Sequence, residues 1–308
     1  MNSTKLPDDP LWPRAAAWLA PGSDERPGGD MALLGVPAFR SSISPTGAHA
    51  TPAAVRDALA RYSTFSASTG VDVTSLRAID LGDVADPDGL EGEARVSAAA
   101  TDAGSRFPLL VAIGGDNSIT FPLMRGLAGR DLAGWGLITL DAHHDLRDGQ
   151  SNGSPVRRLI EAGLPGAHVV QIGIADFSNS AQYADRAHTA GITVMTRASL
   201  RDRDLSEAIA EALRIAGHGG RSIYIDIDVD VCDRAEAPAC PSAAPGGISA
   251  DELRNLTQLL SRDMRVRGID IAEIDATSDA ADGRTVRLAA LLVLEIAAGR
   301  AFEKASST

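Results

Sequence analysis

The sequence is poor in cysteine, and its two cysteines are not placed for a disulfide framework. Cys232 and Cys240 lie eight residues apart in one segment, without a CxxC pair or a neighbouring histidine. A small extracellular scaffold held together by disulfides is therefore not expected. We expect both thiols to be small buried side chains in a loop.

Basic residues and long apolar runs are also scarce. Lysine and arginine number 29 against 41 aspartate and glutamate, for a net charge of −12, whereas nucleic acids and anionic membranes bind basic surfaces. The longest apolar run, 288–298, is shorter than the roughly 20 residues that span a bilayer. The N-terminal residues have no charged-then-apolar signal layout. We predict a cytoplasmic protein with no nucleic acid or membrane partner.

Short apolar runs alternate with longer amphipathic stretches along the whole chain. This alternation predicts about eight βα units, because continuous apolar strands separated by helices of 10–15 residues are typical of parallel sheets. The predicted strands are 31–36, 76–84, 108–115, 135–144, 168–175, 192–196, 222–231 and 266–275, and the clearest predicted helices are 51–62, 89–104, 205–217, 249–262 and 284–302.

The alternation favours an α/β fold: a single three-layer α/β/α domain with an eight-stranded, mostly parallel sheet. With 308 residues, of which 44% are hydrophobic and only 4% aromatic, the chain can bury a large core, roughly 75% of its unfolded surface. No linker divides it. We predict an irregular N-terminal arm over 1–30, rich in Pro, Gly and Asp, and one domain over 31–308.

Two segments place several potential metal ligands at the ends of predicted strands. In 140–145, Asp141, His143 and Asp145 alternate with other residues, so an extended chain points them to one side. His144 then faces the opposite side, and we predict a structural role for it. The remaining histidines have no partner spacing, and we interpret them as surface or core residues.

In the second segment, 224–230, the three aspartates at 226, 228 and 230 share one face of a strand. Three buried carboxylates cannot stay charged side by side without a cation. A solvated, charged strand end is the alternative for each motif alone. Both motifs lie at carboxyl ends of parallel strands, where ligands bind in such sheets, so we predict one shared metal site. Hard oxygen and nitrogen ligands suit Mn²⁺ or a similar ion.

With these residues in view, nearly the whole chain resembles the ureohydrolase superfamily of arginases, agmatinases and formiminoglutamases, which hydrolyse C–N bonds of guanidines or amidines. IGGDNSIT (113–120) is similar to GGDHS, LDAHHDLRDG (140–149) to DAHxD, and SNGSP (151–155) to SHGTP. DVDVCDRAEAPACPSAAPGG (228–247) is similar to DxDxxDPxxAPGTGTPxPGG at equal spacing, and PTGAHATPAAVR (45–56) to PxGAxxGPxxxR. The resemblance implies an arginase-like fold.

The resemblance also implies two Mn²⁺ ions per chain. Asp141 and Asp228 would bridge the two ions. His143 and Asp230 would complete the shell of one ion, and Asp145 would bind the other. Two such ions lower the pKa of a bridging water, and Asp145 would accept and return its proton. Glu273 stands where the family places the glutamate that holds the cationic guanidinium or amidinium of the substrate.

Two departures from the family pattern fall at the metal and substrate positions. Asn117 replaces the histidine of GGDHS, a metal ligand; its neutral amide oxygen can coordinate a hard ion, but more weakly than imidazole, so we expect one weakly held ion. Asn152 replaces the histidine of SHGTP, which is a proton shuttle or substrate contact. Asparagine cannot titrate near neutral pH, so Asn152 is predicted to contact substrate without moving protons.

Substrate choice depends on what binds the far end of the ligand. Formiminoglutamate carries two carboxylates, which arginine binds bidentately, and Arg147, Arg157 and Arg158 follow the metal motif. We therefore predict hydrolysis of formiminoglutamate to glutamate and formamide. Arginase-, agmatinase- or guanidinobutyrase-type release of urea is the alternative activity, and a catalytically silent binding protein is the alternative class. By the resemblance, a homo-oligomer, trimer or hexamer, is expected.

Overall fold

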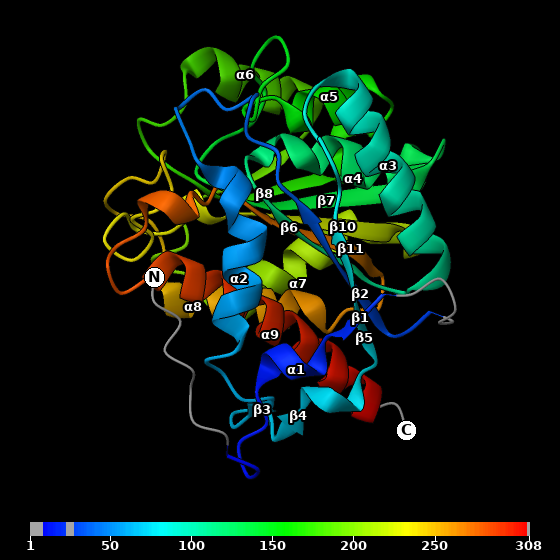
Figure 1. Cartoon of the computed structure of the whole chain (residues 1–308). Helices are drawn as coiled ribbons and strands as arrows, with labels where there is room; N and C mark the ends of the chain where they lie inside the picture. The colour runs from blue at the N-terminus through cyan, green and yellow to red at the C-terminus, as the bar shows by residue number, and fades with distance from the viewer. Residues whose placement is uncertain (1–8, 23–27, 307–308) are drawn as a thin grey trace.

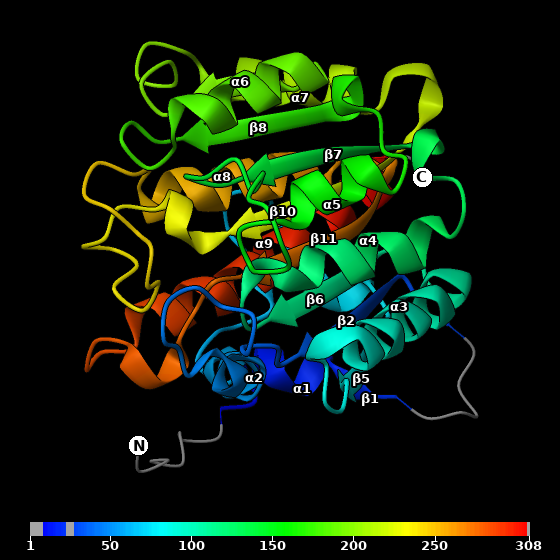
Figure 2. The ribbon, with the colours of Figure 1, turned by 90° about the horizontal axis from the view of Figure 1, so that it is seen from above.

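A nine-stranded parallel sheet forms the centre of the molecule. The computed structural model describes residues 9–22 and 28–306, and within them every neighbouring pair of strands in this sheet is parallel. The order across the sheet is β1-β5-β2-β6-β11-β10-β7-β8-β9, and most of it can be followed in Figure 2. The strands are β1 (Ala20–Pro21), β2 (Met31–Val36), β5 (Ala78–Asp83), β6 (Leu110–Gly114), β7 (Trp135–Leu140), β8 (Val169–Ile174), β9 (Thr193–Thr196), β10 (Ser222–Asp228) and β11 (Val266–Ala272).

Helices cover both faces of the sheet, which gives the three layers predicted from the sequence (Figure 1). Two buried hydrophobic clusters fill the spaces between the layers. On one face lie α1 (Ala15–Trp18), α2 (Thr51–Leu59), α7 (Leu205–Ala216), α8 (Ala250–Ser261) and α9 (Arg284–Ser306). On the other face lie α3 (Gly89–Arg106), α4 (Thr120–Ala128), α5 (Pro155–Glu161) and α6 (Ala181–Ala190).

The sheet has one strand more than the eight predicted. All eight predicted apolar runs form strands, and the additional strand, β1, consists of Ala20 and Pro21, which pair with Ile79 and Asp80. Both β1 and α1 lie in the segment 1–30, which we predicted to be irregular; residues 1–8 and 23–27 of that segment lie outside the described residues. A two-residue strand without an apolar run offers no periodicity to detect.

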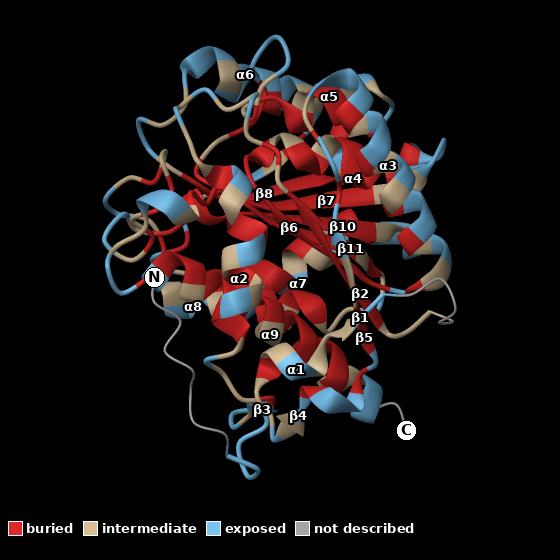
Figure 3. Ribbon diagram, in the orientation of Figure 1, coloured by how far each residue is buried: buried red, intermediate tan, exposed pale blue. Residues whose placement is uncertain are grey.

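The carboxyl ends of the strands converge at one edge of the sheet, toward which the strand arrows in Figure 2 point. The central strands are buried along most of their length (Figure 3), as expected for strands with helices on both faces. The loops after β7, β10 and β11 meet at this edge. For example, the Ala142 backbone N–H, after β7, donates to Asp230 Oδ1, after β10, and the Asp275 backbone N–H, after β11, donates to the Ala239 carbonyl.

Local sequence signals explain the helices that frame this edge. Ser249 and Glu252 form a reciprocal capping box at the start of α8, an arrangement that satisfies two otherwise free backbone N–H groups.

The terminal helix α9 spans 23 residues, and most of its apolar side chains pack against one face of the sheet. Among the described helices, none combines the length and apolar character needed to cross a membrane. A separate two-stranded antiparallel hairpin joins β3 (Phe65–Ser66) and β4 (Val71–Asp72).

Candidate metal centre

A first cluster of ligand atoms is formed by Asp141, His143 and Asp230. One ligand atom from each lies within 4.8 Å of the others, and His143 Nδ1 lies 2.9 Å from Asp230 Oδ2. Asp141 directly follows β7, and Asp230 lies in the short helical turn after β10. Burial alone would lower the pKa of the imidazole, but the charges of the two aspartates outweigh it and raise that pKa.

A second cluster contains Asp141, Asp145 and Asp226, again with ligand atoms within 4.8 Å of one another. All three residues are buried. The two clusters share Asp141, so its carboxylate lies between two neighbouring groups of ligands. Burial raises the pKa of Asp141 to about 6, and the charge of Asp230 adds to the shift. This is the geometry of a binuclear site with one shared carboxylate.

Asp228 is the last residue of β10 and lies next to both clusters without belonging to either. Its Oδ1 accepts a hydrogen bond from the Asp230 backbone N–H at 2.9 Å. Burial raises its pKa well above the ordinary value, and the charges of Asp230 and Asp141 contribute. The Asp228 side chain is therefore close enough for the charges of Asp230 and Asp141 to raise its pKa. Its Oδ2 does not take part in the hydrogen bond with the Asp230 backbone.

Asn117 reaches the second cluster with its NH₂ group. Its Nδ2 donates to Asp145 Oδ2 at 2.7 Å and, at 3.5 Å, to Asp226 Oδ2. Its amide oxygen instead accepts from the Thr120 hydroxyl at 3.1 Å. The oxygen that was predicted to coordinate an ion is thus engaged by α4 in this structure.

Glu273 is held at the end of β11 by two donors that both address Oε1. The Asn117 backbone N–H and Asn152 Nδ2 each lie 2.7 Å from this oxygen. Asn152 is itself fixed, since its Oδ1 accepts from the Ile43 backbone N–H at 3.1 Å. Burial raises the pKa of Glu273 to about 8, with a further contribution from the charge of Asp116. Asn152 therefore positions Glu273 and ties it to the loop around residue 43.

Unusual backbone conformations aim two of these acidic side chains. Asp145 and Glu273 have φ values of 54° and 63°, a region that costs energy for residues other than glycine and is concentrated at functional sites. The Glu273 backbone N–H donates to the Gly115 carbonyl at 2.8 Å. A Cβ atom at Gly115 would lie 1.9 Å from the Ala38 carbonyl oxygen, so only glycine allows this approach.

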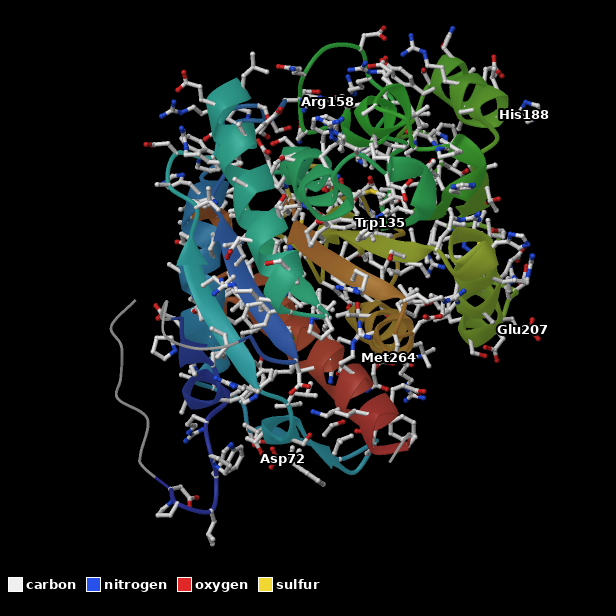
Figure 4. All side chains as sticks on the ribbon, turned by 90° about the vertical axis from the view of Figure 1, so that its right-hand side faces the viewer. Asp72, Trp135, Arg158, His188, Glu207 and Met264 are labelled. Carbon is white, nitrogen blue, oxygen red and sulfur yellow. The ribbon has the colours of Figure 1, made fainter. Side chains whose placement is uncertain are left out.

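Of the three arginines predicted to bind substrate carboxylates, two are engaged elsewhere. Arg158, labelled in Figure 4, forms a partly buried ion pair with Glu93 at 2.7 Å and stacks on the Phe121 ring. Arg157 binds Glu161 and the Arg147 carbonyl. Arg147 is exposed, and its side chain packs against Gly153, where a Cβ would lie 2.8 Å from Arg147 Cδ. Arg147 is the candidate that remains beside Asn152.

The structural roles predicted for other polar residues are confirmed. His144 is buried, and its Nδ1 lies 2.7 Å from Gln171 Oε1. His188 is exposed on α6 (Figure 4). Cys232 and Cys240 are free and buried, and burial raises the pKa of both thiols. None of these side chains belongs to the two ligand clusters.

The two clusters fit a pair of divalent ions. Asp141 Oδ2 is buried without a hydrogen-bond partner among the described residues, and such an oxygen is costly unless a cation compensates it. The spacing of Asp226 from Asp228 and Asp230 predicted that the three aspartates share one face of a strand. Asp226 was not predicted to be a ligand, although it belongs to the second cluster. Asp270, its register partner on β11, was missed, because nothing in one sequence indicates which strands become neighbours.

The metal-free protein is expected to lose stability as the pH rises from about 5 to about 8. Because the pKa values of Asp141 and Glu273 are raised, the folded state holds protons that the unfolded chain has released, and the free energy of unfolding falls across this window. Melting temperatures measured in EDTA should decline with pH. Mn²⁺ should raise the melting temperature more at pH 8 than at about pH 5.5. A melting temperature in EDTA that climbs from pH 5 to 8 would contradict this.

Two ligand clusters that share a carboxylate, at the carboxyl edge of a parallel sheet, define a binuclear metal-binding α/β protein. The chain belongs to the arginase family: the model of that family, "Arginase family", matches residues 29–299. The predicted resemblance to the ureohydrolase superfamily and the arginase-like fold are thereby confirmed.

Among individual relatives, the chain is similar to a formimidoylglutamase of Halalkalibacterium halodurans, with 37% identity over 277 residues that cover 87% of this chain and 86% of the relative. The crystal structure of formimidoylglutamase from Bacillus subtilis superposes with a TM-score of 0.90 at 32% identity, covering 97% and 95% of the two chains. The fold is shared with a Trypanosoma cruzi formiminoglutamase described with Mn²⁺, at a TM-score of 0.86, 24% identity and coverage of 94% and 99%.

Proposed function

We propose that this protein hydrolyses the C–N bond of formiminoglutamate, releasing glutamate and formamide in a manganese-dependent reaction. The observation that carries the proposal is the buried carboxylate of Glu273 beside a binuclear ligand cluster, in a chain 37% identical to a formimidoylglutamase. The formimino group is a cationic, planar amidine at neutral pH. Its hydrolysis needs a carboxylate that pairs with this cation, the role of Glu273 once ionised, and an activated water nearby.

Two Mn²⁺ ions would be held by the residues that line the shared carboxylate. His143 and Asp230 would ligate one ion and Asp145 the other, with Asp141 and Asp228 between them. These oxygen and imidazole nitrogen donors suit Mn²⁺ better than a metal that prefers thiolates. When bound, the two ions would supply an activated water at neutral pH.

The protein's own acidic groups would bind the substrate and move its protons. Glu273, once ionised, would pair with the amidinium, and Asn117 and Asn152 orient it through Oε1. Asp145, whose Oδ2 accepts from Asn117, would take a proton from the attacking water and return it to the departing nitrogen. Asn152 has no titratable group, so proton shuttling depends on Asp145.

Arg147 would bind a carboxylate at the glutamate end of the substrate. It follows the metal motif by two residues, and its exposed side chain rests against Gly153, next to the Asn152–Glu273 pair. A guanidinium can bind a carboxylate through two parallel hydrogen bonds. Neither Arg157 nor Arg158 is available for this contact, because each already binds an acidic residue.

Substrate identity is tested by product release after loading with Mn²⁺. Formamide from formiminoglutamate is expected, whereas urea from agmatine, guanidinobutyrate or arginine would favour the alternative activities, and no product with any of them would favour a silent binding protein. Arg147→Gln should raise KM for formiminoglutamate about 10- to 100-fold, the loss of one charged hydrogen bond. KM for a formamidine without carboxylates should not change.

The control for this substitution is Arg130→Gln, an exposed arginine in the turn after α4. It should leave both KM values unchanged. An equal effect of Arg147→Gln on the two substrates would contradict the assigned role of Arg147 while leaving formamide release unaffected.

Oligomeric state and cellular location remain predictions. A trimer or hexamer is the state expected from the family resemblance, and sedimentation equilibrium of the Mn²⁺-loaded protein would measure it. A cytoplasmic location is expected from the sequence, and fractionation of cells that express the protein would test it.

A further inference from the structure

The backbone of Arg147 is fixed on both sides, although its side chain is exposed. Its N–H donates to the Gly153 carbonyl at 3.0 Å, and its own carbonyl accepts from Arg157 Nε at 2.6 Å. Among the described residues the Arg147 guanidinium has no hydrogen-bond or ion-pair partner. Its direction therefore depends on the residues against which the side chain packs.

Gly153 provides the surface on which the Arg147 side chain lies. A Cβ atom added at Gly153 would lie 2.8 Å from Arg147 Cδ and 3.2 Å from Arg147 Nε, closer than the roughly 3.5–4.0 Å of an ordinary contact between carbon atoms. Gly153 is not among the glycines with positive φ, so its backbone conformation also suits alanine. The missing side chain at this position thus serves the approach of Arg147 rather than a turn.

Ile43 reaches the same place from the loop between β2 and α2. Its Cδ1 would lie 3.4 Å from the Cβ added at Gly153, so the Ile43 and Arg147 side chains converge over Gly153. The Ile43 backbone N–H donates to Asn152 Oδ1 at 3.1 Å, and the Ser41 carbonyl accepts from the Asn152 backbone N–H at 3.2 Å. This loop is therefore fastened to Asn152 and meets Gly153 with an apolar side chain.

Two consecutive residues thus face the two ends proposed for the substrate. Asn152 donates to Glu273, the proposed partner of the amidinium, and Gly153 carries Arg147, the proposed partner of a carboxylate. The Cα atoms of consecutive residues lie about 3.8 Å apart. A shift of the segment that carries one of these binding groups would therefore also move the other.

We propose that Gly153 and Ile43 position the Arg147 guanidinium, and that this support makes the protein select amidines that carry a carboxylate over amidines that lack one. The inference rests on the proposed function, because it concerns the same substrate site. A long side chain that is already held in place loses less conformational entropy when it binds a ligand. The support therefore lowers KM for the carboxylate-bearing substrate, and neither residue touches the reacting atoms.

Gly153→Ala tests the support directly, because the added Cβ displaces the flexible Arg147 side chain. KM for formiminoglutamate should rise about 10-fold, as expected when a charged hydrogen bond is weakened, with kcat unchanged. KM for a formamidine without carboxylates should stay the same. The matched control is Gly104→Ala on α3, where an added Cβ would meet only Leu127 Cδ2 at 2.7 Å. It should leave both KM values at those of the wild-type protein.

Ile43→Ala removes the apolar contact but keeps the backbone N–H that holds Asn152. KM for formiminoglutamate should rise about 3- to 10-fold, the scale of the cost of ordering one long side chain. Ile43→Leu, which keeps a terminal methyl group, should retain most of the wild-type affinity. These two variants test the support if Gly153→Ala does not fold.

A double-mutant cycle shows whether Gly153 acts through Arg147. In the Arg147→Gln background, Gly153→Ala should change KM for formiminoglutamate by less than about 2-fold, because the side chain that it displaces no longer binds the carboxylate. The same substitution in the wild-type background should have its full effect.

Three outcomes would overturn the inference. They are an unchanged KM for formiminoglutamate in both Gly153→Ala and Ile43→Ala, an equal rise of KM for the formamidine without carboxylates, and a full effect of Gly153→Ala in the Arg147→Gln background. Each of them is measured on a protein whose wild-type form releases formamide, so the proposed function stands. A wild-type protein that releases no formamide would instead overturn both the inference and the proposed function.

Discussion

Asp141→Asn is expected to abolish metal binding and activity together. Asp141 is the residue common to both ligand clusters, and its Oδ2 is buried with no other partner among the described residues. An amide at this position aims either a neutral oxygen or an NH₂ group at the ions. Activity should fall by roughly 10³-fold or more, the scale set by losing one group that stabilises developing charge. Mn²⁺ content and kcat measured on the same sample check this.

Stability measurements distinguish loss of the metal from loss of the fold. Without metal, Asp141→Asn should melt no lower than the wild-type protein at pH 8, because it removes one buried charge next to Asp230. Its melting temperature should no longer rise when Mn²⁺ is added. Asp202→Asn, at an exposed position, should behave like the wild-type protein in every assay. Two tightly bound ions in Asp141→Asn would contradict the shared-carboxylate geometry.

Glu273→Gln should reduce kcat/KM by about 10²- to 10³-fold without changing the metal content. Glutamine keeps an oxygen for the two donors that now address Oε1, from Asn117 and Asn152, so the loop geometry is preserved. It removes the negative charge that would face the cationic substrate. Truncating one partner of a buried charge pair weakens the interaction by about 2–5 kcal/mol, a range that includes the expected loss of kcat/KM when it is converted to a free energy. Steady-state kinetics with formiminoglutamate provide the measurement.

The matched control for this charge removal is Glu207→Gln on α7, an exposed glutamate labelled in Figure 4. It should leave kcat/KM unchanged. If Glu273→Gln lost Mn²⁺, Glu273 would be acting on the metal site rather than on the substrate. If it kept full activity, the amidinium would be recognised by another group.

The architecture could be predicted from the sequence because the central strands are almost fully buried. A strand covered by helices on both faces is mostly apolar, as in residues 31–36 of β2, and such runs are visible without knowledge of their neighbours. Short elements were missed because they contain no such apolar run. The two residues of β1 are half-buried or exposed, and α1 has only four residues, so neither leaves a pattern in the sequence.

The site was predictable as far as the position of each motif at a strand end determines it. Asp141, His143 and Asp145 lie in the loop after β7, and a φ of 54° at Asp145 departs from the extended chain assumed for their alternation. Spacing nevertheless placed the three residues at one edge, and the structure brings ligand atoms from each of them into the two clusters. It could not indicate which way the Asn117 amide turns, because that depends on Thr120 one helical turn away. It also could not show that Arg158 is paired with Glu93, 65 residues distant.

The position of β11 has a consequence for how the chain folds. Although it is the last strand to be synthesised, it lies between β6 and β10 in the sheet. Until it pairs, the early strands β1, β5, β2 and β6 and the later group β10, β7, β8 and β9 have no ladder joining them. Contacts of such long sequence separation form slowly. The metal ligands proposed above all lie at or after the ends of β7 and β10, which pair within the later group, whereas the contact between Asn117 and Glu273 joins the ends of β6 and β11. The substrate-binding side of the site is therefore a late product of folding, and recovery of activity during refolding, rather than manganese uptake, would report the moment at which the two halves of the sheet join.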